Sequence, residues 1–142
     1  MCKRKKSDAQ IYLEQVEKLD ALIENKLIER RQWKDLALKI TANMDGERVQ
    51  SSGSKSRMAD AVDKCIDAEE TVALTVDKLM QQKQEVLNAI ESLSPYDYKL
   101  LHKRYIQHIE LKDIAEQWNK DYTTITTAHG RALVRLQQVL NK

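Results

Sequence analysis

The residues best suited to chemistry lie near the C-terminus, on one face of a helix that the sequence predicts from Thr123 onward. Short hydroxyls and guanidinium groups recur there at helical spacing. This face comprises Thr123, Thr126, Thr127, Arg131 and Arg135. Hydroxyls can reach base edges, and guanidinium groups can bind phosphates. The pattern therefore favours a helix that contacts nucleic acid.

The apolar positions of residues 111–140 predict two helices that would hold this face in place. The first covers residues 111–118, and Asn119, Lys120 and Asp121 then interrupt the pattern for about the length of a helix-turn-helix connection. The second helix buries the stripe opposite the hydroxyls, which consists of Ile125, Ala128, Ala132, Leu133, Leu136 and Leu140.

A third helix is predicted just upstream. Ser94 as the N-cap, Pro95 at the first helical position and Asp97 in the first turn form a helix start signal. The inner face of this helix would be Tyr98, Leu101 and Tyr105, with Lys103 and Arg104 outside. Residues 94–142 are thus predicted to form a small three-helix domain of the helix-turn-helix type.

Two residues of the second helix carry separate predictions. His129 falls beside the buried stripe, where we expect a hydrogen-bonded, partly buried imidazole rather than a ligand. Gly130 costs about 1 kcal/mol against alanine inside a helix, so it needs a reason. We predict either a close-packing point for the preceding helix, which is the preferred interpretation, or clearance for a DNA backbone.

Upstream, the sequence predicts two long helices at 8–43 and 57–93, joined by a Gly/Ser-rich loop at 45–56 and preceded by a basic disordered tail at 1–7. The second helix has a seam that steps by four and three without a slip. Its positions are Met58, Val62, Cys65, Glu69, Val72, Val76, Leu79, Lys83, Val86, Ile90 and Leu93. The first helix has a less regular seam, from Tyr12 and Val16 to Trp33, Ala37 and Ile40. Residues 8–93 would form a long antiparallel helical hairpin, although an intermolecular coiled coil uses the same seams.

Composition supports an all-α fold and excludes several function classes. The 142 residues include one proline, three glycines and 32% charged side chains. No 18-residue apolar run is present, so we expect a cytoplasmic protein without a membrane span. Cys2 and Cys65 show no metal-ligand spacing, and His102 and His108 would not share a helical face. We therefore expect no enzyme activity, no catalytic residue, no cofactor and no metal.

The charge is unevenly distributed. Residues 7–94 carry 12 basic and 17 acidic side chains, a balance of −5, whereas residues 95–142 carry 8 and 5, a balance of +3. The C-terminal third is therefore the part that could approach a polyanion.

The segment LLHKRYIQHIELKDIAEQWNKDYTTITTAHGRALVRL resembles the region 4 helix-turn-helix of bacterial sigma factors. The matching positions are Leu111, Ile114, Ala115, Trp118, Ile125, Ala132, Leu133 and Leu136. Residues 45–140 also resemble short phage and prophage transcription regulators of Gram-positive bacteria, of the autolysin-regulatory, sigma-like kind. The segments SGSKSRMADAV, LSPYDYKLLHKRYI and HGRAL carry that resemblance.

The resemblance implies that Tyr122, Thr123, Thr126 and Thr127 read base pairs and that Arg131 contacts the DNA backbone. The chain departs from the pattern, because sigma factors usually place arginines or a glutamine at several of these positions, and the first 94 residues contain no counterpart of sigma region 2. The resulting hypothesis is a DNA-binding transcription regulator that recognises a promoter or operator. Its phosphate contacts would come from Lys103, Arg104, Lys120, Arg131 and Arg135.

Other partners stay open. RNA polymerase is a further candidate partner, and the hairpin could form a homodimer. The alternative hypothesis is a structural or interaction protein whose sigma-like domain binds a protein, such as RNA polymerase, rather than DNA.

Overall fold

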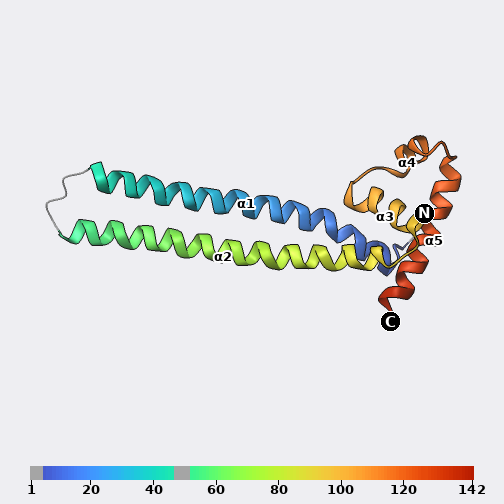
Figure 1. The fold of residues 1–142 in the computed structure, drawn as a ribbon, viewed down its shortest axis with the longest axis horizontal. Helices are drawn as coiled ribbons and strands as arrows, with labels where there is room; N and C mark the ends of the chain where they lie inside the picture. The colour runs from blue at the N-terminus through green and yellow to red at the C-terminus, as the bar shows by residue number, and fades with distance from the viewer. Residues whose placement is uncertain (1–4, 47–51) are drawn as a thin grey trace. The chain divides into compact units, whose positions relative to one another are not determined.

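All regular secondary structure in the described part of the chain is helical, as the sequence predicts. The computed structural model describes residues 5–46 and 52–142, and within them it contains no strand. The elements in order are α1 (Asp8–Gly46), α2 (Ser52–Glu91), α3 (Pro95–Leu101), a π-helical turn η1 (His102–Ile106), α4 (Leu111–Gln117) and α5 (Tyr122–Leu140). Figure 1 shows α1 and α2 as two long, antiparallel helices and the remaining helices as shorter elements, of which α5 is the longest.

The predicted loop at 45–56 is too long. Helix α1 continues to Gly46, and α2 already begins at Ser52, so most of the predicted loop is helical. Glycine and serine are weak helix formers, but such propensities are weak predictors of where a helix ends. Residues 47–51 lie outside the described residues, as do residues 1–4 of the predicted basic tail. In the rest of that tail, Lys6 forms an ion pair with Glu14 at 3.0 Å.

The chain divides into two compact units, of which one is Ala21–Met80. In this unit α1 and α2 pack along the predicted seam of α2, where Cys65, Val72 and Val76 are buried. The polar seam position Glu69 pairs across the helices with Arg30 at 3.4 Å. The seam of α2 is therefore confirmed, and its charged interruption finds a partner. Trp33 of α1 is only partly covered, because its side chain stays 38% exposed.

The other unit combines Met1–Asp20 with Gln81–Lys142. Its main core joins apolar side chains from both long helices to those of α3, η1 and α5. The buried members are Ala9, Leu13, Val16, Val86, Ile90, Leu101, Tyr105, Ala132, Leu133 and Leu136. In α5, the predicted stripe residues Ala132, Leu133 and Leu136 are thus buried as predicted, and they pack on the ends of α1 and α2. Lys83, a polar position of the α2 seam, pairs here with Asp20 at 2.6 Å.

A second, smaller core positions α4 and the start of α5. It contains Leu100, Ile114, Ala115 and Ile125, with Trp118 packed against its edge. The predicted start signal of α3 is confirmed, since the Ser94 hydroxyl accepts a hydrogen bond from the Asp97 backbone N–H at 3.4 Å. The chain reverses at His108 (φ 58°) and Asn119 (φ 53°), on either side of α4.

Candidate nucleic-acid interface

Helix α5 has one fully buried side and one side in solvent. Ile125, Ala132 and Leu136 are 0% exposed, whereas Thr123, Thr127 and Arg131 are exposed. The helix begins at Tyr122, within one residue of the predicted start, and α4 ends at Gln117, within one residue of the predicted end. The hydroxyls and the guanidinium group of the sequence prediction therefore share an accessible face.

The exposed side chains of α5 line a shallow, open groove. The groove has a volume of about 440 Å³, and its walls are Tyr96, Thr123, Thr124, Thr127, Ala128 and Arg131. Tyr96 comes from the first turn of α3, and its ring lies 5.5 Å from that of Trp118. Tyr96 was not predicted from the sequence, because a residue that follows the Ser94-Pro95 start signal has no periodicity linking it to α5.

Three other predicted residues lie around the start of α5. Tyr122 is 58% exposed, and Lys120 is exposed in the turn, where its backbone N–H donates to the Ala115 carbonyl at 2.9 Å. Thr126 differs from the other threonines, because its hydroxyl donates to the Thr123 carbonyl at 2.9 Å. Its proton is therefore used inside the helix, which leaves only acceptor capacity for a base edge.

Arg135 lies one turn beyond Arg131 and makes an intramolecular ion pair. Its Nη1 atom donates to Oδ1 and Oδ2 of Asp97 at 2.8 and 2.7 Å. Asp97 is 1% exposed, so this guanidinium neutralises a buried carboxylate. The pair joins the first turn of α3 to the C-terminal half of α5. From the sequence, Asp97 was predicted only as part of a helix start signal, without a partner on α5.

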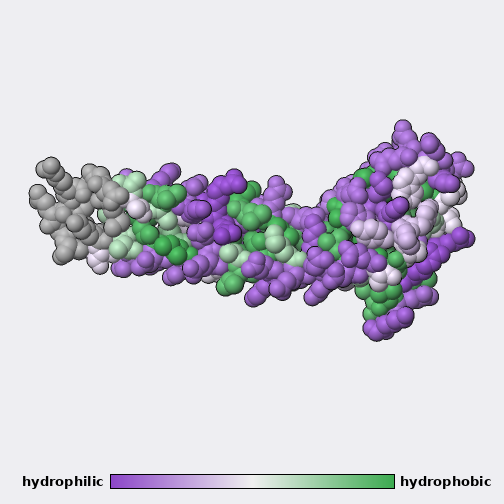
Figure 2. All heavy atoms as spheres, viewed as in Figure 1, coloured by the Kyte–Doolittle hydropathy of each residue, from purple (hydrophilic) through white to green (hydrophobic). Residues whose placement is uncertain are grey.

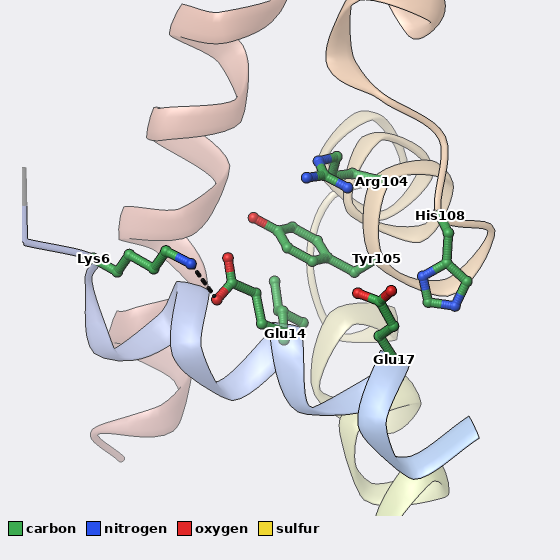
Figure 3. Close-up of a pocket in the computed structure, with 7 residues that line it drawn as sticks. Lys6, Glu14, Glu17, Arg104, Tyr105 and His108 are labelled. Atoms are coloured by element: carbon green, nitrogen blue, oxygen red, sulfur yellow. Dashed lines mark hydrogen bonds and ion pairs between the residues drawn. The ribbon is translucent and has the colours of Figure 1, made fainter. Parts of the chain in front are cut away.

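Lys103 and Arg104 lie away from the groove. The Lys103 ammonium donates to Oε1 of Gln117 at 3.1 Å. Arg104 lines a separate cleft of about 350 Å³ with Lys6, Leu13, Glu14, Glu17, Tyr105 and His108. Figure 3 shows the two glutamates on the α1 wall of this cleft and Arg104 beside Tyr105 on the other. The structure thus does not gather all the predicted cations on one surface.

His129 is partly buried and hydrogen-bonded, as predicted. Its Nε2 lies 2.7 Å from the Tyr105 hydroxyl, and the two rings stack with centroids 5.7 Å apart. Burial, together with the charge of Arg104, lowers the pKa of His129 to about 4. Burial raises the pKa of Tyr105 to about 12. Both groups are therefore neutral at pH 7, which suits a packed pair in the core and gives neither ring a charge for ligand binding.

The preferred interpretation of Gly130 is wrong. A Cβ atom placed on Gly130 would meet nothing within 4 Å, so no neighbouring helix needs the space. The residue is exposed on α5, because its position falls outside the buried stripe. The second interpretation, clearance for a DNA backbone, stays a prediction.

The acidic side chains of α4 form a second exposed feature. Glu110, Asp113 and Glu116 line an open groove with His108, Ile109 and Gln117. Its negative charge would repel phosphates. Any nucleic acid that meets α5 must therefore avoid this side of α4.

Within residues 5–46 and 52–142, no group of three or more His, Cys, Asp or Glu side chains is placed to hold a metal ion. Among the described helices, none carries an apolar stretch of the length that spanning a lipid bilayer requires. No family model matches the chain, and neither the curated proteins nor the solved structures gave a significant match.

Proposed function

We propose that this chain is a DNA-binding transcription regulator that inserts the start of α5 into the major groove of a promoter or operator. The observation that carries the proposal is the open groove where Thr123, Thr127 and Arg131 face solvent while the opposite side of α5 is buried. A helix held from behind, preceded by a tight turn and a shorter helix, is how helix-turn-helix proteins present base-reading side chains. The resemblance to sigma region 4 and to phage regulators points the same way.

The contacts divide the work between affinity and sequence preference. Thr123 and Thr127 have short hydroxyls near the helix start, where base edges are reached, and Tyr122 extends this surface. Arg131 and Lys120 are exposed cations that would bind phosphates. Arg104 and Arg135 instead serve the fold in this proposal, because each already lies against a group of the protein.

A second candidate function is binding of a protein such as RNA polymerase, and the acidic surface of α4 favours it. Glu110, Asp113 and Glu116 stand on one exposed groove and would complement a basic protein surface. The negative charge of these side chains would weaken binding to DNA but would strengthen binding to a basic protein. Replacing Asp113 and Glu116 by lysine should strengthen binding to DNA but should abolish binding to a basic protein partner.

The test uses fluorescence anisotropy with duplexes selected from a random library, measured over a salt series. Arg131→Ala should weaken binding to every sequence and reduce the salt slope by about one unit, since one phosphate contact is lost. Thr127→Ala should change discrimination at one or two base pairs by about 1 kcal/mol and leave the salt slope unchanged. Lys39→Ala, which removes an exposed cation of the Ala21–Met80 unit, is the matched control and should behave as wild type.

Two results would contradict the proposal in different ways. If the wild-type protein binds no duplex at low salt, DNA binding is wrong and the protein-partner function takes its place. If Arg131→Ala and Thr127→Ala cause equal losses on all sequences, DNA binding stands but Thr127 does not read bases.

A further inference from the structure

Several large apolar side chains of the Ala21–Met80 unit remain exposed to solvent. Leu27, Ile66 and Met80 are 41%, 43% and 48% exposed, although each adjoins the buried seam. Figure 2 shows apolar side chains reaching the surface over both long helices. Monomeric proteins rarely leave contiguous apolar patches uncovered, so this distribution calls for a partner surface.

On α2 these side chains form a regular row. Ala59, Ile66, Ala73 and Met80 follow one another at intervals of seven, so they lie on one face beside the Val62, Glu69 and Val76 side of the seam. With this row, the apolar face of α2 uses three positions of each seven-residue repeat, whereas the seam between two helices requires only two of them. The spacing therefore indicates that α2 contacts a further helix as well as α1.

Leu27 of α1 lies on the same side of the helix pair as this row. Leu27 directly follows the seam residue Lys26, just as each member of the α2 row directly follows a seam residue. In two antiparallel helices, such equivalent positions beside the seam lie on the same side of the pair. The Arg30–Glu69 ion pair sets the register between the helices. In that register Leu27 stands level with Ala73, so a large side chain on α1 is at the height of a small one on α2.

We infer that a second copy of this chain covers this face, with α2 of each copy packed on α1 of the other. A twofold axis parallel to the helices keeps every residue at its own height. Leu27 of one copy then fits against Ala73 of the other, between Ile66 and Met80. The same patch serves both copies, as an isologous contact requires.

Charge supports this pairing of unlike helices. Residues 21–43 carry five basic and three acidic side chains, a balance of +2, and residues 57–80 carry three and six, a balance of −3. Packing α2 on α2 would bring like charges together, whereas packing α2 on α1 brings opposite charges together. Glu70 and Arg31, both exposed, stand at about the same height at the outer edge of the contact.

The oligomeric state of the full chain tests the inference. Sedimentation of the wild-type protein at low and high micromolar concentration should show a species of twice the chain mass. Ile66→Glu and Leu27→Glu should each weaken the dimer at least about tenfold, because each buries a charge in the contact. Leu74→Glu is the matched control: Leu74 is 64% exposed on α2 but lies outside the row, so this dimer should persist.

A charge exchange provides a second test that leaves the apolar contact intact. Glu70→Arg should weaken the dimer, and the combination with Arg31→Glu should restore it, with helical circular dichroism unchanged throughout. A wild-type protein that is monomeric at every concentration would overturn the inference. So would a dimer that Ile66→Glu leaves intact and Leu36→Glu dissociates, because Leu36 flanks the opposite side of the seam.

Discussion

Arg135 and Arg131 stand one turn apart on α5, yet Arg135 forms an ion pair with the buried Asp97 carboxylate whereas Arg131 lines the open groove. The Arg135→Ala substitution tests what this ion pair contributes. The substitution would leave the Asp97 carboxylate, 1% exposed, without its cation. Removing one partner of a buried ion pair costs about 3–5 kcal/mol. The Arg135 side chain is 52% exposed, so water already reaches its side of the pair and can partly replace it. We therefore expect a loss of about 2–3 kcal/mol in the free energy of unfolding.

Urea unfolding followed by Trp118 fluorescence measures this loss. A Trp33→Phe background removes the only other tryptophan, which belongs to the Ala21–Met80 unit, so the signal reports on the unit that holds Asp97. Arg131→Ala is the matched control and should stay within about 0.5 kcal/mol of the background protein, since Arg131 is exposed. A double-mutant cycle with Asp97→Ala should assign most of the loss to the pair.

The same variants separate stability from DNA binding. Under conditions where all of them are folded, Arg131→Ala should reduce the salt slope of binding, and Arg135→Ala should leave it unchanged. An Arg135→Ala protein as stable as the Arg131→Ala control would refute the structural role of the Asp97 pair. A reduced salt slope for Arg135→Ala would instead support the phosphate contact that was predicted for Arg135 from the sequence.

Three further predictions concern stability. Val76→Asp should lower the free energy of unfolding of the Ala21–Met80 unit by about 3 kcal/mol, because Val76 is 5% exposed on the seam. Trp33 fluorescence in a Trp118→Phe background measures this loss, and an unchanged unfolding midpoint would contradict the burial of Val76 in the seam. Gly130→Ala should raise the free energy of unfolding by up to about 1 kcal/mol, since the added methyl group meets no atom within 4 Å. A loss of stability would contradict the open space around Gly130. The pKa of His129 is lowered to about 4 from 6.5, so the unfolded chain takes up a proton first as the pH falls, and stability should decrease from about pH 6.5 toward pH 4. Between pH 7 and 5 the free energy of unfolding should fall by about 1–2 kcal/mol after allowance for solvent exposure. Urea titrations of wild type and His129→Gln should show that the free energy of unfolding depends less on pH in the variant.

The long helices could be predicted from sequence because their signal is local and repeated. Each seam position of α2 from Met58 to Leu93 is buried or half-buried, which a spacing of four and three already implies. The ends of the same helices were less predictable, since α2 extends through Ser52, Gly53 and Ser54 despite their weak helix propensity. The partners of Glu69 and Lys83 also required the structure, because each comes from the other long helix.

The candidate site was predictable only where periodicity decides it. Spacing alone places Thr123, Thr127 and Arg131 opposite the Ile125–Leu136 stripe, and the structure leaves them exposed. Tyr96 enters the same groove from another helix, so no pattern within α5 could indicate it.

Spacing also cannot distinguish Arg131 from Arg135, because residues four apart share a helical face. The two arginines differ in their contact with Asp97, which lies 38 residues upstream of Arg135. Asp97 stands at the start of a helix, where exposed carboxylates are common. An acidic residue in a first turn is favoured by the helix dipole whether it is buried or not, so its local role gives no sign of a distant partner. The distinction arises only when α3 packs across α5, and it decides which of two identical side chains is held by a buried carboxylate.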